Sequence, residues 1–251
     1  MFTDKINNNT LISHMEDLAG KAQKAGVSVS RFLTPAEIAS ISNHFKFNKV
    51  KLIFDGGFEA AERKRAVFLN EDRGIYNKED FLSGIKFAYR MADTLTHRDV
   101  LGSIMALGIE RDTIGDILCT DGNSFVVCIP EMNRYIIDNI TKIGRIGVSA
   151  TEISIDELPI LQEVLETKTA SVASLRLDAV LSVCFKLSRS KAAEAISAGR
   201  VYINHLECIQ PSKELTKDDL ISVRGTGRAK LLDICGKSKK GRLLIEIGLY
   251  Q

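Results

Sequence analysis

The side chains best suited to bind a ligand are cations and hydroxyls that gather between residues 176 and 204. They are Arg176, Lys186, Ser188, Arg189, Ser190, Lys191 and Arg200. Guanidinium and ammonium groups bind phosphate through charge-assisted hydrogen bonds. The backbone N–H groups at a helix N-terminus also favour anions. The predicted chemistry is therefore the binding of a polyanion.

Two short helices and a strand are predicted to position these groups. The first helix is predicted from apolar residues at i, i+3, i+4 and i+7, namely Leu177, Val180, Leu181 and Cys184. Ser188 is the predicted N-cap of the second helix, Gly199 is its C′ residue, and a strand begins at 201–204. Arg189 and Arg200 are eleven residues apart, about three turns. They would share one side of the second helix if that helix reached Arg200.

This segment resembles an S4 RNA-binding domain, a module of two helices and a small antiparallel sheet. The matching motifs occur in the module's order: Arg176-Leu177-Asp178, Ser188-Arg189-Ser190-Lys191, Gly199-Arg200-Val201, Ile203-Asn204, and 219–223 with Gly225. One departure is His205, which stands where the family usually has Gly in a turn. His adopts a positive φ less readily than Gly, so the turn type is left open.

The S4 resemblance implies a set of residues that bind structured RNA. These are Arg176, Asp178, Lys186, Ser188, Arg189, Ser190, Lys191, Arg200 and Asn204. The cations would contact phosphates, and the two serines would add hydrogen bonds. Asp178 has two alternative roles: it orients Arg176, or it favours the helix N-terminus electrostatically.

The bulk composition describes an ordinary globular protein with an uneven charge distribution. Its 251 residues suffice for two or three domains, and they are 45% hydrophobic and 26% charged. Residues 168–251 carry a net charge of +7, whereas residues 1–167 carry −5. We therefore expect the C-terminal part to contact a polyanion.

The sequence carries no signals for secretion or membrane insertion. The N-terminus has no apolar core of a signal peptide, and no apolar run approaches the roughly 18 residues of a membrane span. The five cysteines are scattered without a CxxC pair, which favours reduced, buried thiols in a cytosolic protein. The four histidines are isolated, so no metal site and no cofactor are predicted.

The predicted fold class is α+β, with four segments. They are an N-terminal α/β subdomain at 1–76, a central ferredoxin-like domain at 77–153, a connection at 154–173, and the S4 domain with C-terminal strands at 174–251. The N-terminal segment is predicted to contain two or three helices followed by a strand pair at 50–54 and 66–69, with a helix start at Thr34 and Pro35. Asp55-Gly56-Gly57 is predicted to be a turn, because it lacks the Lys and Ser/Thr of a P-loop.

The central segment has the element order βαββαβ. The predicted elements are strand 81–90, helix 97–107, strands 114–120 and 125–129, helix 132–140 and strand 145–153. RNA-recognition motifs share this topology and stack bases on paired aromatics of their third strand. Here that strand offers only Phe125. We therefore favour a core role for Phe125, with base stacking as the alternative.

Further basic residues are candidates for secondary RNA contacts. They are Arg63, Lys64, Arg65, Arg224, Arg228, Lys237, Lys239 and Lys240. The run 63–65 is interpreted first as a solvated helix face and alternatively as a phosphate contact. The tip of a predicted C-terminal hairpin at 236–241 is either a solubilising turn or a finger that contacts phosphate.

Over nearly its whole length the chain resembles the YlmH family of bacterial S4-domain proteins. The further motifs are Asp55-Gly56-Gly57-Phe58, 62–66, 98–102, 114–117 and 141–145. The family implies a cytoplasmic, non-catalytic, monomeric RNA-binding protein of the large ribosomal subunit. Its RNA would be rRNA or tRNA, including stalled peptidyl-tRNA, and a link to cell division is implied. A related branch is linked to photosystem II assembly, so the setting stays open.

Two rival function classes remain. An RNA-modifying enzyme is one, because S4 modules are often appended to enzymes. The nearest match to a pseudouridine synthase motif is Leu175-Arg176-Leu177-Asp178, which falls inside the predicted S4 helix. The other rival is a protein–protein adaptor that uses the acidic N-terminal body. We expect no enzymatic activity, no metal and no membrane partner.

Overall fold

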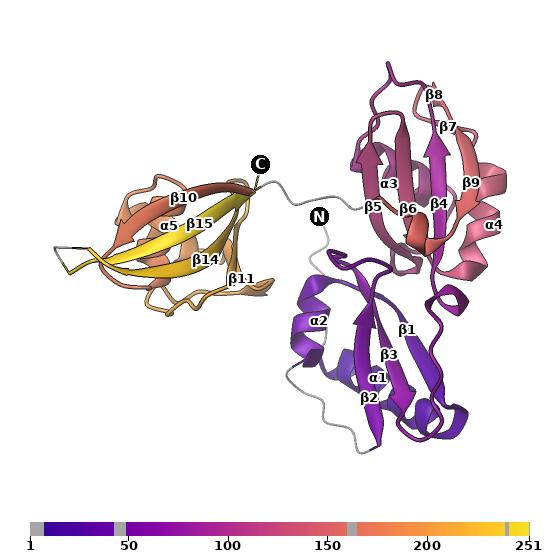
Figure 1. Ribbon diagram of the computed structural model, residues 1–251, viewed down its shortest axis with the longest axis horizontal. Helices are drawn as coiled ribbons and strands as arrows, with labels where there is room; N and C mark the ends of the chain where they lie inside the picture. The colour runs from indigo at the N-terminus through magenta and orange to yellow at the C-terminus, as the bar shows by residue number, and fades with distance from the viewer. Residues whose placement is uncertain (1–7, 43–48, 160–164, 239–240, 251) are drawn as a thin grey trace. The chain divides into compact units, whose positions relative to one another are not determined.

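The computed structural model describes residues 8–42, 49–159, 165–238 and 241–250. The chain divides into two compact units, 1–161 and 162–251, shown with their labelled elements in Figure 1. The boundary expected between residues 76 and 77 falls inside the first unit. Within the described residues, no helix has the length and apolar character needed to span a membrane.

The first unit begins with a three-stranded antiparallel sheet and two helices. Its elements are α1 (Asn8–Ala25), β1 (Val27–Leu33), α2 (Pro35–Ser42), β2 (Val50–Asp55) and β3 (Lys64–Asn70). The strand order is β1-β3-β2, and Met15 and Phe68 lie fully buried between helices and sheet. Strand β1 was not expected. It pairs with β3, Val27 opposite Leu69, so its partner is remote in the sequence.

The turn Asp55-Gly56-Gly57 is confirmed. The Gly57 N–H donates to the Asp55 carboxylate at 2.8 Å, an arrangement that fixes the turn locally. A Cβ on Gly56 would come within 2.5 Å of both the Ala61 Cβ and the Arg63 carbonyl oxygen. Only glycine fits this position without displacing backbone.

The remainder of the first unit is a four-stranded antiparallel sheet with two helices. Its elements are η1 (Lys78–Asp80), β4 (Ser83–Ala88), α3 (His97–Met105), η2 (Arg111–Thr113), β5 (Ile114–Thr120), β6 (Asn123–Cys128), α4 (Pro130–Asn139), β7 (Lys142–Ile143), β8 (Ile146–Gly147), β9 (Ser149–Ile153) and η3 (Ile155–Glu157). The strand order β5-β6-β4-β9 puts the first and third strands of the motif at the centre. The ferredoxin-like prediction is confirmed.

The helix-free face of this sheet is partly covered by the chain itself. Val127 is fully buried there in a cluster with Phe32 of β1 and Ile155 of η3. Phe125 and Phe58 are partly buried against the same cluster. Phe125 therefore belongs to a core, as the sequence predicted, on the face that RNA-recognition motifs use for stacking.

Two arginines of the basic run 63–65 bind backbone carbonyls inside the first unit. Arg63 Nε donates to the Ile114 carbonyl oxygen at 3.2 Å, and Arg65 Nε donates to the Ser30 carbonyl oxygen at 2.6 Å. Burial lowers the pKa of both guanidinium groups. The interpretation of this run as a solvated helix face is wrong. Arg65 lies in β3, and the partners of both arginines are distant in the sequence.

The second unit is a six-stranded antiparallel sheet with two helices on one face. Its elements are β10 (Leu165–Val172), α5 (Leu177–Cys184), α6 (Arg189–Ser197), β11 (Val201–Ile203), β12 (Leu206–Glu207), β13 (Leu220–Val223), β14 (Gly227–Lys237) and β15 (Leu243–Tyr250). The strand order is β10-β15-β14-β13-β11-β12. Strand β10 pairs along its whole length with β15, so residues 165–172 of the expected connection at 154–173 are instead an edge strand of this sheet.

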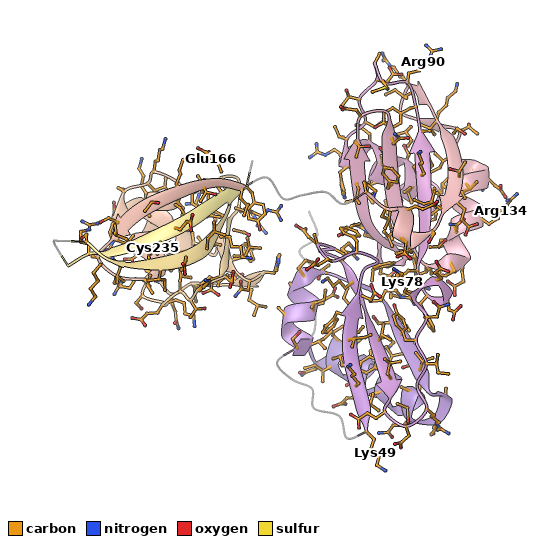
Figure 2. All side chains as sticks on the ribbon, viewed as in Figure 1. Lys49, Lys78, Arg90, Arg134, Glu166 and Cys235 are labelled. Carbon is orange, nitrogen blue, oxygen red and sulfur yellow. The ribbon has the colours of Figure 1, made fainter. Side chains whose placement is uncertain are left out.

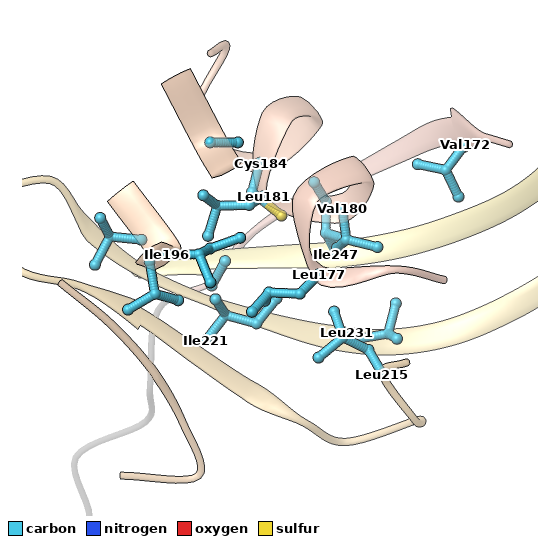
Figure 3. Close-up of a cluster of buried hydrophobic side chains, with 14 of the residues drawn as sticks. Val172, Leu177, Val180, Leu181, Cys184, Ile196, Leu215, Ile221, Leu231 and Ile247 are labelled. Atoms are coloured by element: carbon cyan, nitrogen blue, oxygen red, sulfur yellow. The ribbon is translucent and has the colours of Figure 1, made fainter. Parts of the chain in front are cut away.

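Apolar side chains of α5, α6 and the sheet form one core, shown in Figure 3. Leu177, Val180 and Leu181 of α5 are fully buried and face Ile221 and Ile247 of the sheet. The helical spacing read from the sequence therefore identifies the buried face of α5 correctly.

The five cysteines are free thiols, but they are not all buried. Cys128 and Cys184 are buried, and burial raises the pKa of each thiol to about 12. Cys119 and Cys208 are half-buried. Cys235, labelled in Figure 2, is exposed because β14 extends beyond the sheet's core there. The expectation of uniformly buried thiols is wrong for Cys235.

Candidate nucleic-acid interface

The N-terminal ends of α5 and α6 bring together most of the predicted RNA-binding residues. Arg176 directly precedes α5. Ser188 caps α6, because its Oγ accepts a hydrogen bond from the Lys191 N–H at 3.2 Å. The Ser188 and Ser190 hydroxyl oxygens lie 3.0 Å apart. The predicted N-cap is confirmed, and it places two hydroxyls and Lys191 in the first turn of α6.

Asp178 joins the two helix ends. Its side chain is 9% exposed, and Oδ2 accepts a hydrogen bond from Arg189 Nη2 at 2.6 Å. Arg176 donates to the same carboxylate, from Nε at 3.2 Å and from Nη2 at 3.3 Å. Burial of Asp178 opposes its ionisation, but the hydrogen bonds from Arg176 and Arg189 outweigh burial and lower the pKa of the carboxyl.

This geometry supports the orienting role for Asp178 and extends it to a second arginine. The Arg176 and Arg189 side chains are 42% and 52% exposed, so one side of each is fixed while the other faces solvent. Each guanidinium has five N–H donors, and Asp178 engages only some of them. Lys186 and Lys191 are exposed close by in sequence. Arg176, Arg189, Lys186 and Lys191 form a pre-oriented cationic surface, hereafter the α5–α6 surface, that can bind phosphate groups.

Arg200 lies past the C-terminal end of α6, apart from these N-terminal residues, and its predicted RNA contact stays a prediction. Helix α6 ends at Ser197, and Gly199 follows with a φ of 66°. The Gly199 N–H donates to Ile196 O at 3.0 Å and the Arg200 N–H to Ala195 O at 3.1 Å, which is a Schellman motif. The shared azimuth expected for Arg189 and Arg200 is therefore wrong. The two residues lie at opposite ends of α6.

Asn204 is a structural residue of the sheet. Its Nδ2 donates to Asp219 Oδ1 at 2.7 Å, and its Oδ1 accepts from the Leu220 N–H at 2.9 Å. Asn204 and His205 have φ values of 48° and 69° between the strands β11 and β12. Positive φ at both positions identifies a type I′ turn, so His205 does adopt the conformation that the family usually assigns to Gly. The predicted RNA contact at Asn204 is not favoured, because its amide is engaged in the fold.

The secondary candidates divide into four groups. Arg63 and Arg65 have structural partners, as described above. Arg224 is exposed and Arg228 half-buried, and each lies beside a tyrosine ring. Lys64 is half-buried and Lys237 exposed, and their predicted contacts stay predictions. Lys239 and Lys240 lie outside the described residues. The sequence reasoning missed the tyrosines, although alternation along the strands could have placed them on the face opposite the core.

Two family models match the chain on the parts just described. The model described as "Putative RNA-binding domain in YlmH" matches residues 77–157, and the model "S4 domain" matches residues 175–221. The first match spans the ferredoxin-like sheet, and the second spans α5, α6, β11, β12 and the start of β13.

Two proteins are similar to the chain over much of its length. "Ribosome-associated protein quality control protein P2" of Bacillus subtilis (strain 168) is 32% identical over 219 residues, which cover 86% of this chain and 84% of the relative. The structure "Cell division protein ylmH from Streptococcus pneumoniae" has a TM-score of 0.51, with 22% identity, and covers 62% of this chain and 97% of that chain. At this identity the structure supports the fold alone. The identity to the Bacillus relative, together with both family models, shows that the chain belongs to the YlmH family of S4-domain RNA-binding proteins.

Proposed function

We propose that this protein is a non-catalytic RNA-binding protein whose second unit docks on structured RNA of the large ribosomal subunit, either rRNA or tRNA. The observation that carries the proposal is the bridging of Arg176 and Arg189 by the buried Asp178 carboxylate. A carboxylate that holds two cations in place reduces the ordering cost when those cations bind a phosphate.

The contacts proposed here are to the RNA backbone. Arg176, Arg189, Lys186 and Lys191 would contact phosphates, and the hydroxyls of Ser188 and Ser190 would accompany them at the start of α6. Such contacts fix position and carry little sequence information, so specificity would come from RNA shape. Binding through several phosphates also predicts a steep dependence on salt.

The Bacillus relative named for ribosome-associated quality control supports a role of that kind for this chain. We include in the proposal a cytoplasmic, monomeric protein without cofactor, and a link to cell division like that named for the Streptococcus protein. The pairing of Asp178 with two guanidinium groups supports a positioning role for this residue over that of a catalytic aspartate.

The test is the affinity of the full chain for ribosomal large subunits and for an rRNA hairpin taken from them. The double variant Arg176→Gln/Arg189→Gln should weaken both interactions. It should also make the negative slope of log affinity against log salt shallower by about 2. The matched control is Lys168→Gln with Lys217→Gln, since half-buried Lys168 pairs with Glu166 and exposed Lys217 pairs with Asp233 in the same unit.

A fold control is needed because Asp178 loses both partners in the arginine double variant. Adding Asp178→Asn removes the unpaired buried charge and should restore stability without restoring RNA affinity. Wild-type affinity in the double variant, or equal losses in the lysine control, would show that the α5–α6 surface is not the docking site.

A further inference from the structure

The second unit has a second surface, on the face of its sheet opposite α5 and α6. Val201, Val223 and Ala229 point into the helix-covered core. Their neighbours along each strand must therefore point to the other face, because side chains alternate. Tyr202 lies opposite Ser222, and Ser222 lies opposite Arg228.

The same register extends this row to the end of β15. Ala229 lies opposite Leu249, so Arg228 and Tyr250 are the next facing pair on the adjacent strands. Four neighbouring strands thus contribute Tyr250, Arg228, Ser222 and Tyr202 in order. At a strand spacing of 4.7–4.9 Å, the two tyrosines are separated by about 14 Å.

Each tyrosine in the row is paired with an arginine. The Arg228 Cζ lies 4.7 Å from the centroid of the Tyr250 ring. The Arg224 Cζ lies 5.9 Å from the centroid of the Tyr202 ring, and its Nη2 donates to the Tyr202 hydroxyl at 3.2 Å. Both distances fall within the range of a cation–π contact. The row therefore carries two guanidinium groups positioned by rings, with a small serine between them.

The S4 family model covers only part of this row. Its match ends at residue 221, so Tyr202 lies inside it, whereas Arg224, Arg228 and Tyr250 lie outside. Lys230, next along the same face, pairs with Asp218 at 3.4 Å. The surface thus combines planar groups with positive charge, on a unit whose residues 168–251 carry a net charge of +7.

We infer that this face binds unpaired RNA nucleotides that adjoin the RNA helix docked on the α5–α6 surface. The inference rests on the proposed RNA-binding function and adds a second, chemically different contact to it. Unpaired bases stack on aromatic rings and on arginine planes, and guanidinium groups also bind phosphates. Duplex RNA keeps its bases stacked inside the helix and gains nothing from such a surface. The positive charge favours RNA over a neutral protein partner.

The test compares two RNA probes with the full chain. One is a blunt RNA hairpin, and the other is the same hairpin with a single-stranded extension. The wild type should bind the extended probe more tightly by about tenfold, as expected for one or two stacked bases. The double variant Arg224→Lys/Arg228→Lys keeps the positive charge but changes the planar guanidinium groups. It should abolish the difference between the two probes and leave the affinity for the blunt hairpin unchanged. Tyr202→Leu with Tyr250→Leu should do the same.

The outcomes separate this inference from the proposed function. If the wild type gains nothing from the extension, or if both double variants keep the gain, the inference is overturned. The role of the α5–α6 surface in docking is tested independently, by the loss of affinity for the blunt hairpin in the double variant Arg176→Gln/Arg189→Gln. The double control Lys168→Gln with Lys217→Gln should leave both probes unaffected. Hydrogen exchange in β14 should confirm that the sheet is intact in each variant.

Discussion

Replacing Asp178 by Asn tests whether this residue positions the two arginines. Asn has nearly the same shape, but it lacks the charge and presents an NH2 group to two guanidinium groups. A buried hydrogen bond to a charged group stabilises by about 1.5–3 kcal/mol. Since Arg189 is 52% exposed and can be hydrated in the variant, we expect a loss of only about 1–2 kcal/mol in the free energy of unfolding of the second unit.

The pH dependence of that loss has a definite sign. The native pKa of Asp178 is lowered, chiefly because hydrogen bonds from Arg176 and Arg189 outweigh its burial. Its stabilising contribution is therefore complete above the ordinary Asp pKa of about 3.9 and is lost as the pH falls through the lowered native value. The stability difference between wild type and Asp178→Asn should be constant from about pH 5 upward and should close in stronger acid.

Urea unfolding of the full chain across this pH range measures the difference, and hydrogen exchange of α5 and α6 assigns it to the second unit. A difference that persists unchanged in strong acid would show that the carboxylate charge is not what holds the helix ends together. Equal stability at neutral pH would refute the bridging role itself.

The RNA-binding consequence follows from the same geometry. Asp178→Asn keeps every cation, so the salt dependence of RNA binding should stay the same. The guanidinium groups of Arg176 and Arg189 must now be ordered on binding, at a cost of about 0.5–1.5 kcal/mol for each side chain. For the two side chains together this cost is about 1–3 kcal/mol, so affinity should fall by about 5- to 150-fold. Unchanged affinity would refute pre-orientation, and a changed salt slope would mean that Asp178 alters the number of phosphate contacts.

Three further predictions concern other parts of the chain. A maleimide should label exposed Cys235 in the native protein but should reach buried Cys128 and Cys184 only after unfolding, as mass spectrometry can show. Gly56→Ala should destabilise the first unit by about 1–3 kcal/mol, measured by thermal unfolding, because its Cβ would meet backbone at 2.5 Å. Asn204→Gly keeps the turn but removes two hydrogen bonds of 2.7 and 2.9 Å, so urea unfolding should show a loss of about 1–3 kcal/mol with an unchanged salt slope for RNA.

The features predicted correctly from the sequence are set by residues close together in the chain. Ser188 caps α6 through Lys191, three residues on, and Gly199 ends it with a positive φ. The turn at Asp55 closes on Gly57. The ferredoxin-like order also emerges from successive local patterns. In each case the physical cause lies within a few residues of its effect.

The features that were missed depend on partners far away in the sequence. Arg63 and Arg65 form a charged run that suggests solvent, but their carbonyl partners lie on strands more than thirty residues away. Asp178 meets Arg189 because α5 and α6 pack against each other in one core, which brings their first turns within hydrogen-bond reach. Strand β10 is polar in sequence at Glu166 to Thr169, and only its pairing with β15 makes it part of a sheet. Sequence patterns carry no direct record of such contacts.

The ferredoxin-like sheet is matched by a family model named for RNA binding, but its helix-free face is partly covered by the chain itself. Phe58 and Ile155 cover part of the face on which related folds stack bases. Among the described residues of this region, Lys142 and Arg145 are exposed in and beside the small β7–β8 hairpin. We expect any RNA contact of this region to be made to phosphates, and this hairpin is one of its exposed basic sites. Lys142→Gln with Arg145→Gln should then reduce the salt slope, whereas Phe125→Leu should leave RNA affinity unchanged.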